Sequence, residues 1–274
     1  MDWLNRMWQT ATSAQPVPEA TLVWGSGLLV LVVLSVPVVW HLVRHLVTIV
    51  HEAGHAGVAV LAGRRLAGIR VHTDTSGLTT SWGRQGGPGL VFTLMAGYPA
   101  PAVVGLGVAW LLSRGYAVGA LWALLVLLVL VLVQVRNLYG LWVVLVSTGV
   151  LVAVTGWAPT NLQVGAAYLV AWLLLLGAPR AVLEMTVTRR RGADTSDAGQ
   201  LARLTRVPAS VWVGLFFVLT VGVLALGVWL VAPTDGPEAV SGGSFRSPVA
   251  LWEEQPAAAG SQLDFVHDLG EAVA

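Results

Sequence analysis

The chain has 274 residues, of which 56% are hydrophobic and only 11% charged, and its formal net charge is +1. Soluble domains carry about 25% charged residues, so this composition excludes an ordinary soluble domain and predicts a chain surrounded mostly by lipid. The small net charge argues against nucleic acid as a partner. Because the chain has no cysteine, a metal would have to be bound by His, Asp or Glu.

Seven segments are long and apolar enough to be membrane helices, which need about 20 apolar residues. They are residues 22–40, 41–63, 87–112, 117–135, 139–157, 162–178 and 207–231. The second segment is unusual because it contains Arg44, Glu52 and four histidines. We therefore predict an all-α polytopic membrane protein with about seven transmembrane helices. They occupy residues 21–232 and follow an N-terminal segment of residues 1–20.

Three polar segments lie outside these helices. Residues 68–81 alternate with a period of about two and are rich in β-branched side chains, which predicts a small membrane-associated β-hairpin around Ser76 and Gly77. Residues 189–206 form a polar connector that begins with an arginine run. Residues 233–274 are rich in Gly, Pro, Ser and Ala, which predicts a disordered C-terminal tail.

The distribution of arginines predicts the orientation in the membrane, because positive charge concentrates on the cytoplasmic side. With an odd number of spans, twelve of the fifteen arginines lie on the same face as the N-terminus, and only Arg44, Arg114 and Arg246 lie on the other face. We therefore expect a multi-pass protein of the cell membrane. Its N-terminus would be cytoplasmic and its C-terminal tail external.

The second segment contains the motif His51-Glu52-Ala53-Gly54-His55, an H-E-x-x-H sequence. On a helix, residues four apart share a face, so His51 and His55 can bind one metal ion while Glu52 acts as the general base. Ionisable groups inside a membrane helix cost roughly 2.5–3.5 kcal/mol each. This cost favours a functional site over histidines and a glutamate that are merely hydrogen-bonded in the protein core.

A catalytic zinc site normally has three protein ligands, so one more His, Asp or Glu is needed. The best candidate is Asp197, at the start of a short amphipathic stretch. The alternatives are four residues that lie on or near the same face of the membrane, namely Asp194, Asp74, His72 and Glu184.

These motifs resemble those of the site-2 protease family of intramembrane zinc metallopeptidases, and in particular its bacterial branch. The family has its H-E-x-x-H in a membrane helix and an Asp-Gly motif, commonly followed by Gly-x-Leu, on a later helix. Asp197-Ala198-Gly199-Gln200-Leu201 matches that second motif at its Asp, its second Gly and its Leu. The resemblance implies zinc on His51, His55 and Asp197, and Glu52 as the general base.

The chain departs from the family pattern at several points. Ala198 replaces the first glycine of the Asp-Gly pair, the Asn-x-x-Pro stretch before the aspartate is not recognisable, and no PDZ insert is present. The hairpin resembles the family's β element, which is thought to align an unfolded substrate as an added strand. We therefore assign substrate binding to Thr73, Ser76, Gly77 and Asn137.

The most favoured function is hydrolysis of a peptide bond in a membrane-spanning protein, such as a single-span regulator, by water that zinc activates. Two other functions remain open. One is a metal transporter or metal-binding membrane protein that uses a ladder of His41, His45, His51 and His55. The other is a catalytically inactive scaffold.

Overall fold

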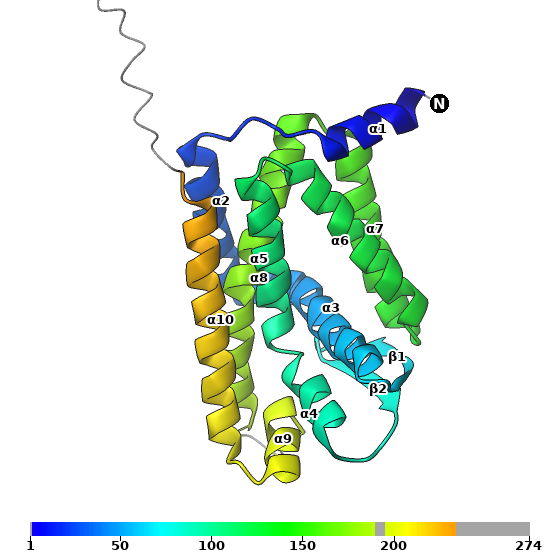
Figure 1. Ribbon diagram of the computed structural model, residues 1–274. Coiled ribbons are helices and arrows are strands. Elements are labelled where there is room, and N and C mark those ends of the chain that lie inside the picture. Colours follow the sequence, from blue (N-terminus) through cyan, green and yellow to red (C-terminus); the bar gives the residue numbers. More distant parts are fainter. Residues whose placement is uncertain (1, 190–194, 234–274) are drawn as a thin grey trace, which may run out of the picture. The chain divides into compact units, whose positions relative to one another are not determined.

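The structure is a computed structural model, and it describes residues 2–189 and 195–233. The predicted C-terminal tail, apart from residue 233, therefore lies outside the described residues. The described part is mostly helical, with one two-stranded sheet (Figure 1). The elements are α1 (Asp2–Thr12), α2 (Ala20–Ser35), α3 (Pro37–Leu61), β1 (Arg65–Val71), β2 (Gly77–Trp82), α4 (Pro88–Met95), α5 (Pro99–Ser113), α6 (Ala117–Gln134), α7 (Leu138–Trp157), α8 (Thr160–Arg189), α9 (Asp197–Thr205) and α10 (Ala209–Val231).

Four helices, α6, α7, α8 and α10, are each long and apolar enough to cross a membrane. Two further pairs pass the same test together but are bent, α2 with α3 by 110° and α4 with α5 by 61°. Counting each bent pair as one crossing, the described residues contain up to six spans. The membrane class and the small sheet are thus confirmed, whereas the predicted seven spans are not.

The bend between α2 and α3 explains the difference in the number of spans. Pro37 has no backbone N–H, and the residue before a proline is disfavoured in the helical conformation. Val36 is accordingly extended, with φ −93° and ψ 110°, and Pro37 begins α3. The boundary therefore falls before Pro37 and not at residue 40. The 16 residues of α2 rise by about 24 Å, less than the roughly 30 Å of a bilayer core.

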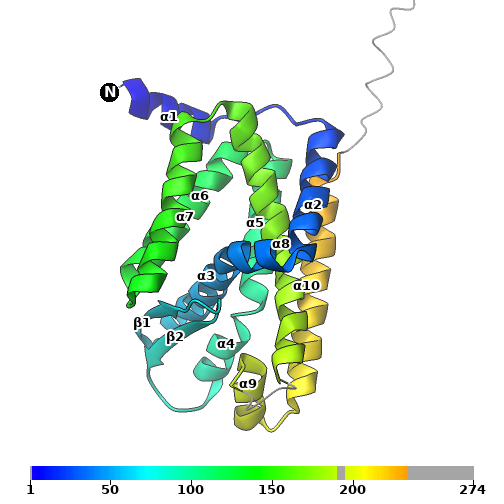
Figure 2. The same cartoon turned by 180° about the vertical axis from the view of Figure 1, so that it is seen from behind.

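The described part of the chain begins and finishes at the same end of the helical bundle (Figures 1 and 2). The start of α2 and the end of α10 lie at the end that carries α1, and the hairpin, α4 and α9 lie at the opposite end. Helix α8 runs through the middle and packs against α2, α5, α6 and α10. Close approach depends on small residues, because a Cβ on Gly105 of α5 would lie 3.0 Å from Leu174.

The hairpin predicted for residues 68–81 is present, and its first strand begins at Arg65, three residues before the predicted start. β1 and β2 are antiparallel, with Ile69 opposite Thr79 and Val71 opposite Gly77. The outer edge of β1 is paired with the segment between α6 and α7. Ile69 forms a parallel bridge with Val135, and the Asn137 side chain bonds both the N–H and the C=O of Val71, at 3.1 and 2.7 Å.

The outer edge of β2 is different. The turn bond from His72 N to Ser76 O sets the alternation of the antiparallel ladder, so Gly77 and Thr79 direct their N–H and C=O groups away from β1. Within residues 2–189 and 195–233, no strand or bridge pairs with that edge. β2 therefore offers an edge onto which another extended chain can add.

Candidate metal centre

The two histidines of the H-E-x-x-H motif lie together on one face of α3. His55 Nε2 is 3.1 Å from His51 Nε2, and the rings meet edge to face. His55 is buried and His51 partly buried. The i, i+4 spacing thus places both imidazoles on one point, as the sequence predicts.

Asp197 brings a carboxylate to the same point from the first turn of α9. Its Oδ2 lies 3.2 Å from Nε2 of His51 and 3.2 Å from Nε2 of His55. Ser196 caps the helix by accepting a hydrogen bond from Gly199 N at 3.2 Å. Burial alone would raise the pKa of the Asp197 carboxyl, but the two histidines lower that pKa well below its ordinary value.

The position of α9 is determined by its buried side chains. Ala198 and Leu201 have no exposed surface and pack with Val182 of α8 and Phe216 of α10. The amphipathic pattern of this stretch therefore turns Leu201 inward and leaves Asp197 directed at the histidines. Ala198, which departs from the family's glycine, is accommodated in this contact.

The three ligand atoms fit a metal ion. One atom each from His51, His55 and Asp197 lies within 4.8 Å of the others. Ligands at about 2.0 Å in a tetrahedron lie about 3.3 Å apart, close to the separations of 3.1 and 3.2 Å in this structure. In addition, Oδ2 of Asp197 is buried without a hydrogen-bond partner among the described residues. This donor set is one that a divalent ion would satisfy.

A contact outside the ligand set orients His55. Its Nδ1 lies 2.7 Å from the carbonyl oxygen of Thr93 in α4. A carbonyl oxygen accepts only, so Nδ1 carries a proton, and in the neutral ring Nε2 is then the nitrogen with the lone pair that a metal ion needs. The Thr93 carbonyl therefore selects the tautomer that can bind a metal.

Glu52 points from α3 toward the hairpin. The hydroxyl of Thr79 donates to its Oε2 at 2.6 Å and lies 3.1 Å from its main-chain oxygen. Glu52 is only 3% exposed, and a Cβ on Gly77 would come within 2.6 Å of its Cδ. β2 therefore holds the carboxylate in place, and Gly77 leaves the room that it needs.

Gly97 and Tyr98, at the break between α4 and α5, complete the site. A Cβ on Gly97 would overlap the imidazole of His55 and lie 2.6 Å from Cε1 of His51. The Tyr98 ring packs edge-on against His51, with centroids 4.7 Å apart, and stacks on Phe216. The sequence reasoning did not include either residue in the site. The only sign of these two residues in the sequence is that Gly97, Tyr98 and Pro99 interrupt an apolar segment.

We expect Gly97→Ala to weaken metal binding by at least about tenfold, as changes beside metal ligands commonly do, because the added methyl group would displace both imidazoles. Titration of the purified protein with zinc would measure this effect. Gly107→Ala is the matched control, since a Cβ at that position of α5 meets nothing within 4 Å. Equal zinc affinity of the two variants would contradict the steric argument.

The rival third ligands are placed differently. Asp74 accepts hydrogen bonds from the backbone and the hydroxyl of Ser76, and His72 also contacts that hydroxyl. Glu184 bonds Trp40 Nε1 at 2.6 Å and pairs with Arg44 at 3.3 Å. Asp194 lies outside the described residues. Of the described candidates, only Asp197 joins the two histidines in a group that could hold a metal ion.

The residues proposed for substrate binding fall into three positions. Thr73 and Ser76 are exposed in the turn of the hairpin. Gly77 lies on β2 beside Glu52. Asn137 uses its amide to hold β1. Substrate binding by these residues remains a prediction, and Thr79, which bonds Glu52, joins them as a neighbour of the site.

The other two histidines of α3 face a different partner. Nε2 of His45 is 2.9 Å from the Tyr139 hydroxyl, and its Nδ1 is 3.1 Å from Leu42 O. Both ring nitrogens of His45 are thus engaged in hydrogen bonds. His41 contacts the His45 ring, with centroids 6.0 Å apart. This arrangement does not favour the four-histidine ladder, because His45 has no free nitrogen to offer.

A cluster of charged groups fastens α8 to α3. Arg180 stacks over Trp40 at 4.9 Å and lies 3.5 Å from Glu184, which also pairs with Arg44. Because Val182 in the same stretch packs against α9, this part of α8 contacts both helices that supply the ligand atoms.

We expect Arg180→Gln to lower the free energy of unfolding by about 1 kcal/mol, since the pair is partly exposed. Thermal unfolding in detergent would measure this change. Arg114→Gln is the matched control, because Arg114 also stacks on a tryptophan, Trp110 at 5.3 Å. No carboxylate in the described part of the chain pairs with it. An equal loss in both variants would show that the ion pair contributes nothing.

A model of the family described as Peptidase M50B-like matches residues 24–227. The matched region contains the whole of the candidate metal centre. Neither the curated proteins nor the solved structures gave a match.

Proposed function

The chain belongs to the Peptidase M50B-like family, a site-2 protease family, and we propose that it is an intramembrane zinc metalloprotease. The observation that carries the proposal is the convergence of His51 and His55 on α3 with Asp197 on α9. These residues are 142 positions apart in the sequence, from 55 to 197. Only the fold brings them together, in a helical bundle with up to six membrane spans.

The proposed reaction assigns separate tasks to the residues of the site. His51, His55 and Asp197 would hold the zinc ion. When bound, the ion would supply Lewis-acid chemistry, which lowers the pKa of water toward about 7 and polarises a carbonyl. Glu52, oriented by the Thr79 hydroxyl, takes a proton from the attacking water. It passes that proton to the leaving nitrogen as the C–N bond breaks.

We further propose that the substrate is a membrane-spanning protein whose cleaved segment adds to the outer edge of β2. Gly77 and Thr79 direct backbone groups to that edge, and both contact Glu52. A strand added there would therefore run beside the general base. A helical segment must unwind to form those bonds, so substrates with a weak helix near one end of the span are favoured.

The arginine distribution supports a revised orientation. Arginines concentrate at the end of the bundle that carries the hairpin and α9, namely Arg64, Arg65, Arg70, Arg84, Arg136, Arg203 and Arg206. Arg114, which follows α5, lies at the other end. We propose that the hairpin end faces the cytoplasm. With six spans, α1 and the end of α10 are then external, so the N-terminus moves from the cytoplasmic side first expected.

Removal of the metal tests this proposal. Treatment with a chelator should abolish cleavage of a single-span test protein by the full chain in liposomes, and stoichiometric Zn²⁺ should restore it. The readouts are zinc content by mass spectrometry and the cleavage products on a gel. Full cleavage by metal-free protein, or a zinc-loaded protein that cleaves none of a panel of single-span proteins, would refute the proposed activity.

A further inference from the structure

Side-chain hydrogen bonds join one face of α3 to the hairpin at two places. The Thr48 hydroxyl donates to the carbonyl oxygen of Thr75, in the turn of the hairpin, at 2.9 Å. One helical turn further along α3, the Glu52 carboxylate accepts from the Thr79 hydroxyl on β2 at 2.6 Å. Residues four apart lie on the same face of a helix. Thr48 and Glu52 therefore hold the hairpin together, the first at its turn and the second on its strand.

The contact between Thr48 and the turn is shielded from water. Thr48 is 8% exposed and Thr75 only 1%, whereas residues 72–74 and 76 of the same turn are exposed. Thr75 is thus the residue of the turn that faces inward. A buried carbonyl oxygen is costly to leave without a donor, so the Thr48 hydroxyl stabilises this position of the turn.

The backbone of Thr75 also needs to be held. Its φ is 66°, in the left-handed region that β-branched residues rarely adopt, and such a conformation persists only where the surrounding contacts maintain it. Two of its hydrogen bonds stay within the turn, from its N–H to His72 O at 3.1 Å and from its hydroxyl to Asp74 O at 2.6 Å. The bond from Thr48 ties the turn to α3.

The edge of β2 proposed to bind the substrate begins directly after this turn. Gly77 is the first residue of β2 and would, with a Cβ, come within 2.6 Å of the Glu52 Cδ. Thr79, two positions further along, bonds the same carboxylate. The edge is therefore fixed relative to the general base before a second strand arrives. Such preorganisation lowers the entropic cost of binding.

We infer that Thr48 is a positioning residue, whose hydroxyl keeps the turn in place so that the edge of β2 is ordered when the substrate adds to it. This inference rests on the proposed hydrolysis. Thr48 acts through Thr75, and the bond between Thr79 and Glu52 does not depend on its hydroxyl. Loss of that hydroxyl should therefore weaken substrate binding while the chemical step and the bound zinc are retained.

Thr48→Val tests the inference, because valine has nearly the size of threonine and cannot donate. For a single-span protein that the wild type cleaves in liposomes, we expect KM to rise about threefold to tenfold, as loss of one hydrogen bond implies. We expect kcat and zinc content to stay within about twofold of the wild type. Thr48→Ser keeps the donor and should restore KM. Amide hydrogen exchange over residues 72–79, which needs no cleavage, should be faster in Thr48→Val alone.

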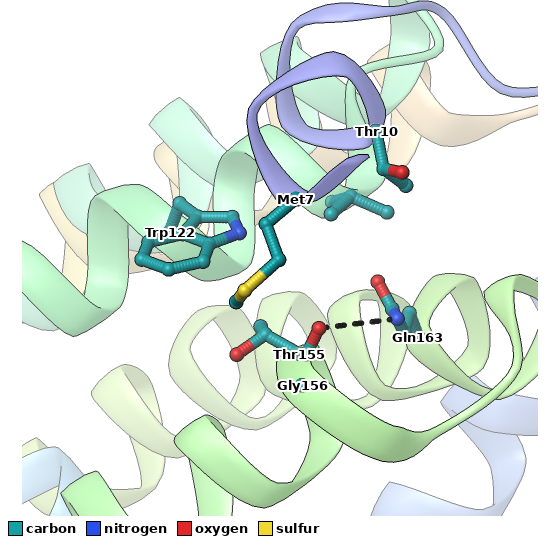
Figure 3. Close-up of a pocket in the computed structure, with 7 residues that line it drawn as sticks. Met7, Thr10, Trp122, Thr155, Gly156 and Gln163 are labelled. Carbon is teal, nitrogen blue, oxygen red and sulfur yellow. Dashed lines mark hydrogen bonds between the residues drawn. The ribbon is translucent and has the colours of Figure 1, made fainter. Parts of the chain in front are cut away.

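Thr155→Val is the matched control. Thr155 is 6% exposed, and its hydroxyl donates to the main-chain oxygen of Leu151, within its own helix, at 2.8 Å. It lines a cavity of about 280 Å³ at the end of the bundle opposite the hairpin, where Figure 3 shows its carbonyl oxygen bonded by Gln163. Removing this hydroxyl should change neither KM, kcat nor exchange in the hairpin.

Three results would overturn the role of Thr48. These are a KM in Thr48→Val no higher than in Thr155→Val, an equal rise in Thr48→Val and Thr48→Ser, and a loss of kcat or zinc at constant KM. The last would show that the hydroxyl acts at the metal centre and not on the substrate edge. Failure of the proposed function is distinguishable, because the zinc-loaded wild type itself would then cleave none of the test proteins, and the role of Thr48 would fall with it.

Discussion

Replacing Glu52 by glutamine is expected to lower the rate of peptide hydrolysis by about 10²–10⁴-fold and to leave the bound zinc unchanged. Glutamine has nearly the same shape and keeps an oxygen that can accept the Thr79 hydroxyl, which now bonds Oε2 at 2.6 Å. It cannot take a proton from water at neutral pH. Chemistry and metal binding should therefore separate in this variant, measured by cleavage rate and by zinc content.

Glu19→Gln is the control for this experiment, because Glu19 is an exposed carboxylate just before α2. Its removal should change neither rate nor zinc. If Glu52→Gln retained most of the cleavage activity, Glu52 would not be the base and the assignment of the mechanism would fail. If it lost zinc together with activity, the glutamate would have a role in holding the metal, which its contacts do not indicate.

Replacing Asp197 by alanine is expected to reduce zinc affinity by more than about 100-fold and to remove activity with it. Losing a neighbour of a ligand already costs 10–100-fold, and losing a ligand leaves two imidazoles without an anionic partner. Asp197 Oδ2 is the atom that lies 3.2 Å from both His51 and His55. Zinc content of variants purified without chelator would measure the loss, with His55→Ala as the positive reference.

Asp74→Ala is the matched control among the acidic residues. Asp74 lies in the exposed turn of the hairpin, where it accepts from Ser76, so its loss should leave zinc binding intact. Full zinc retention by Asp197→Ala would refute the ligand set. Zinc loss on Asp74→Ala with a folded protein would point instead to the hairpin as the source of the third ligand.

Much of the site follows from local pattern. The spacing of His51 and His55 places two imidazoles on one helix face whatever surrounds them, because an α-helix repeats every 3.6 residues. Asp197 was chosen by resemblance, since nothing in its own neighbourhood identifies a partner 142 positions away (55 to 197). Gly97 was not assigned to the site because it contributes no side chain there; it only leaves space for the two imidazoles. Such a role cannot be read from sequence spacing.

The number of spans shows a similar division. Hydropathy identifies apolar segments correctly, and α6, α7, α8 and α10 correspond to four predicted spans. Hydropathy does not, however, give the direction of a helix axis. The chain bends by 110° at Val36 and Pro37, so two predicted spans form one bent pair. The prediction that the two termini lie on opposite sides of the membrane required an odd number of spans. It is not supported, because α1 and the end of α10 lie at the same end of the bundle.

The sequence by itself determined the membrane class, the position of the hairpin and the face of α3 that carries His51 and His55. Each of these depends on the composition or periodicity of one continuous stretch. Only the tertiary structure decided that Asp197 meets the histidines, that Thr79 and Gly77 hold Glu52, and that Asn137 closes one edge of the sheet and leaves β2 open. These contacts join residues from separate elements. Their geometry comes from packing, as when buried Leu201 turns α9 toward α3.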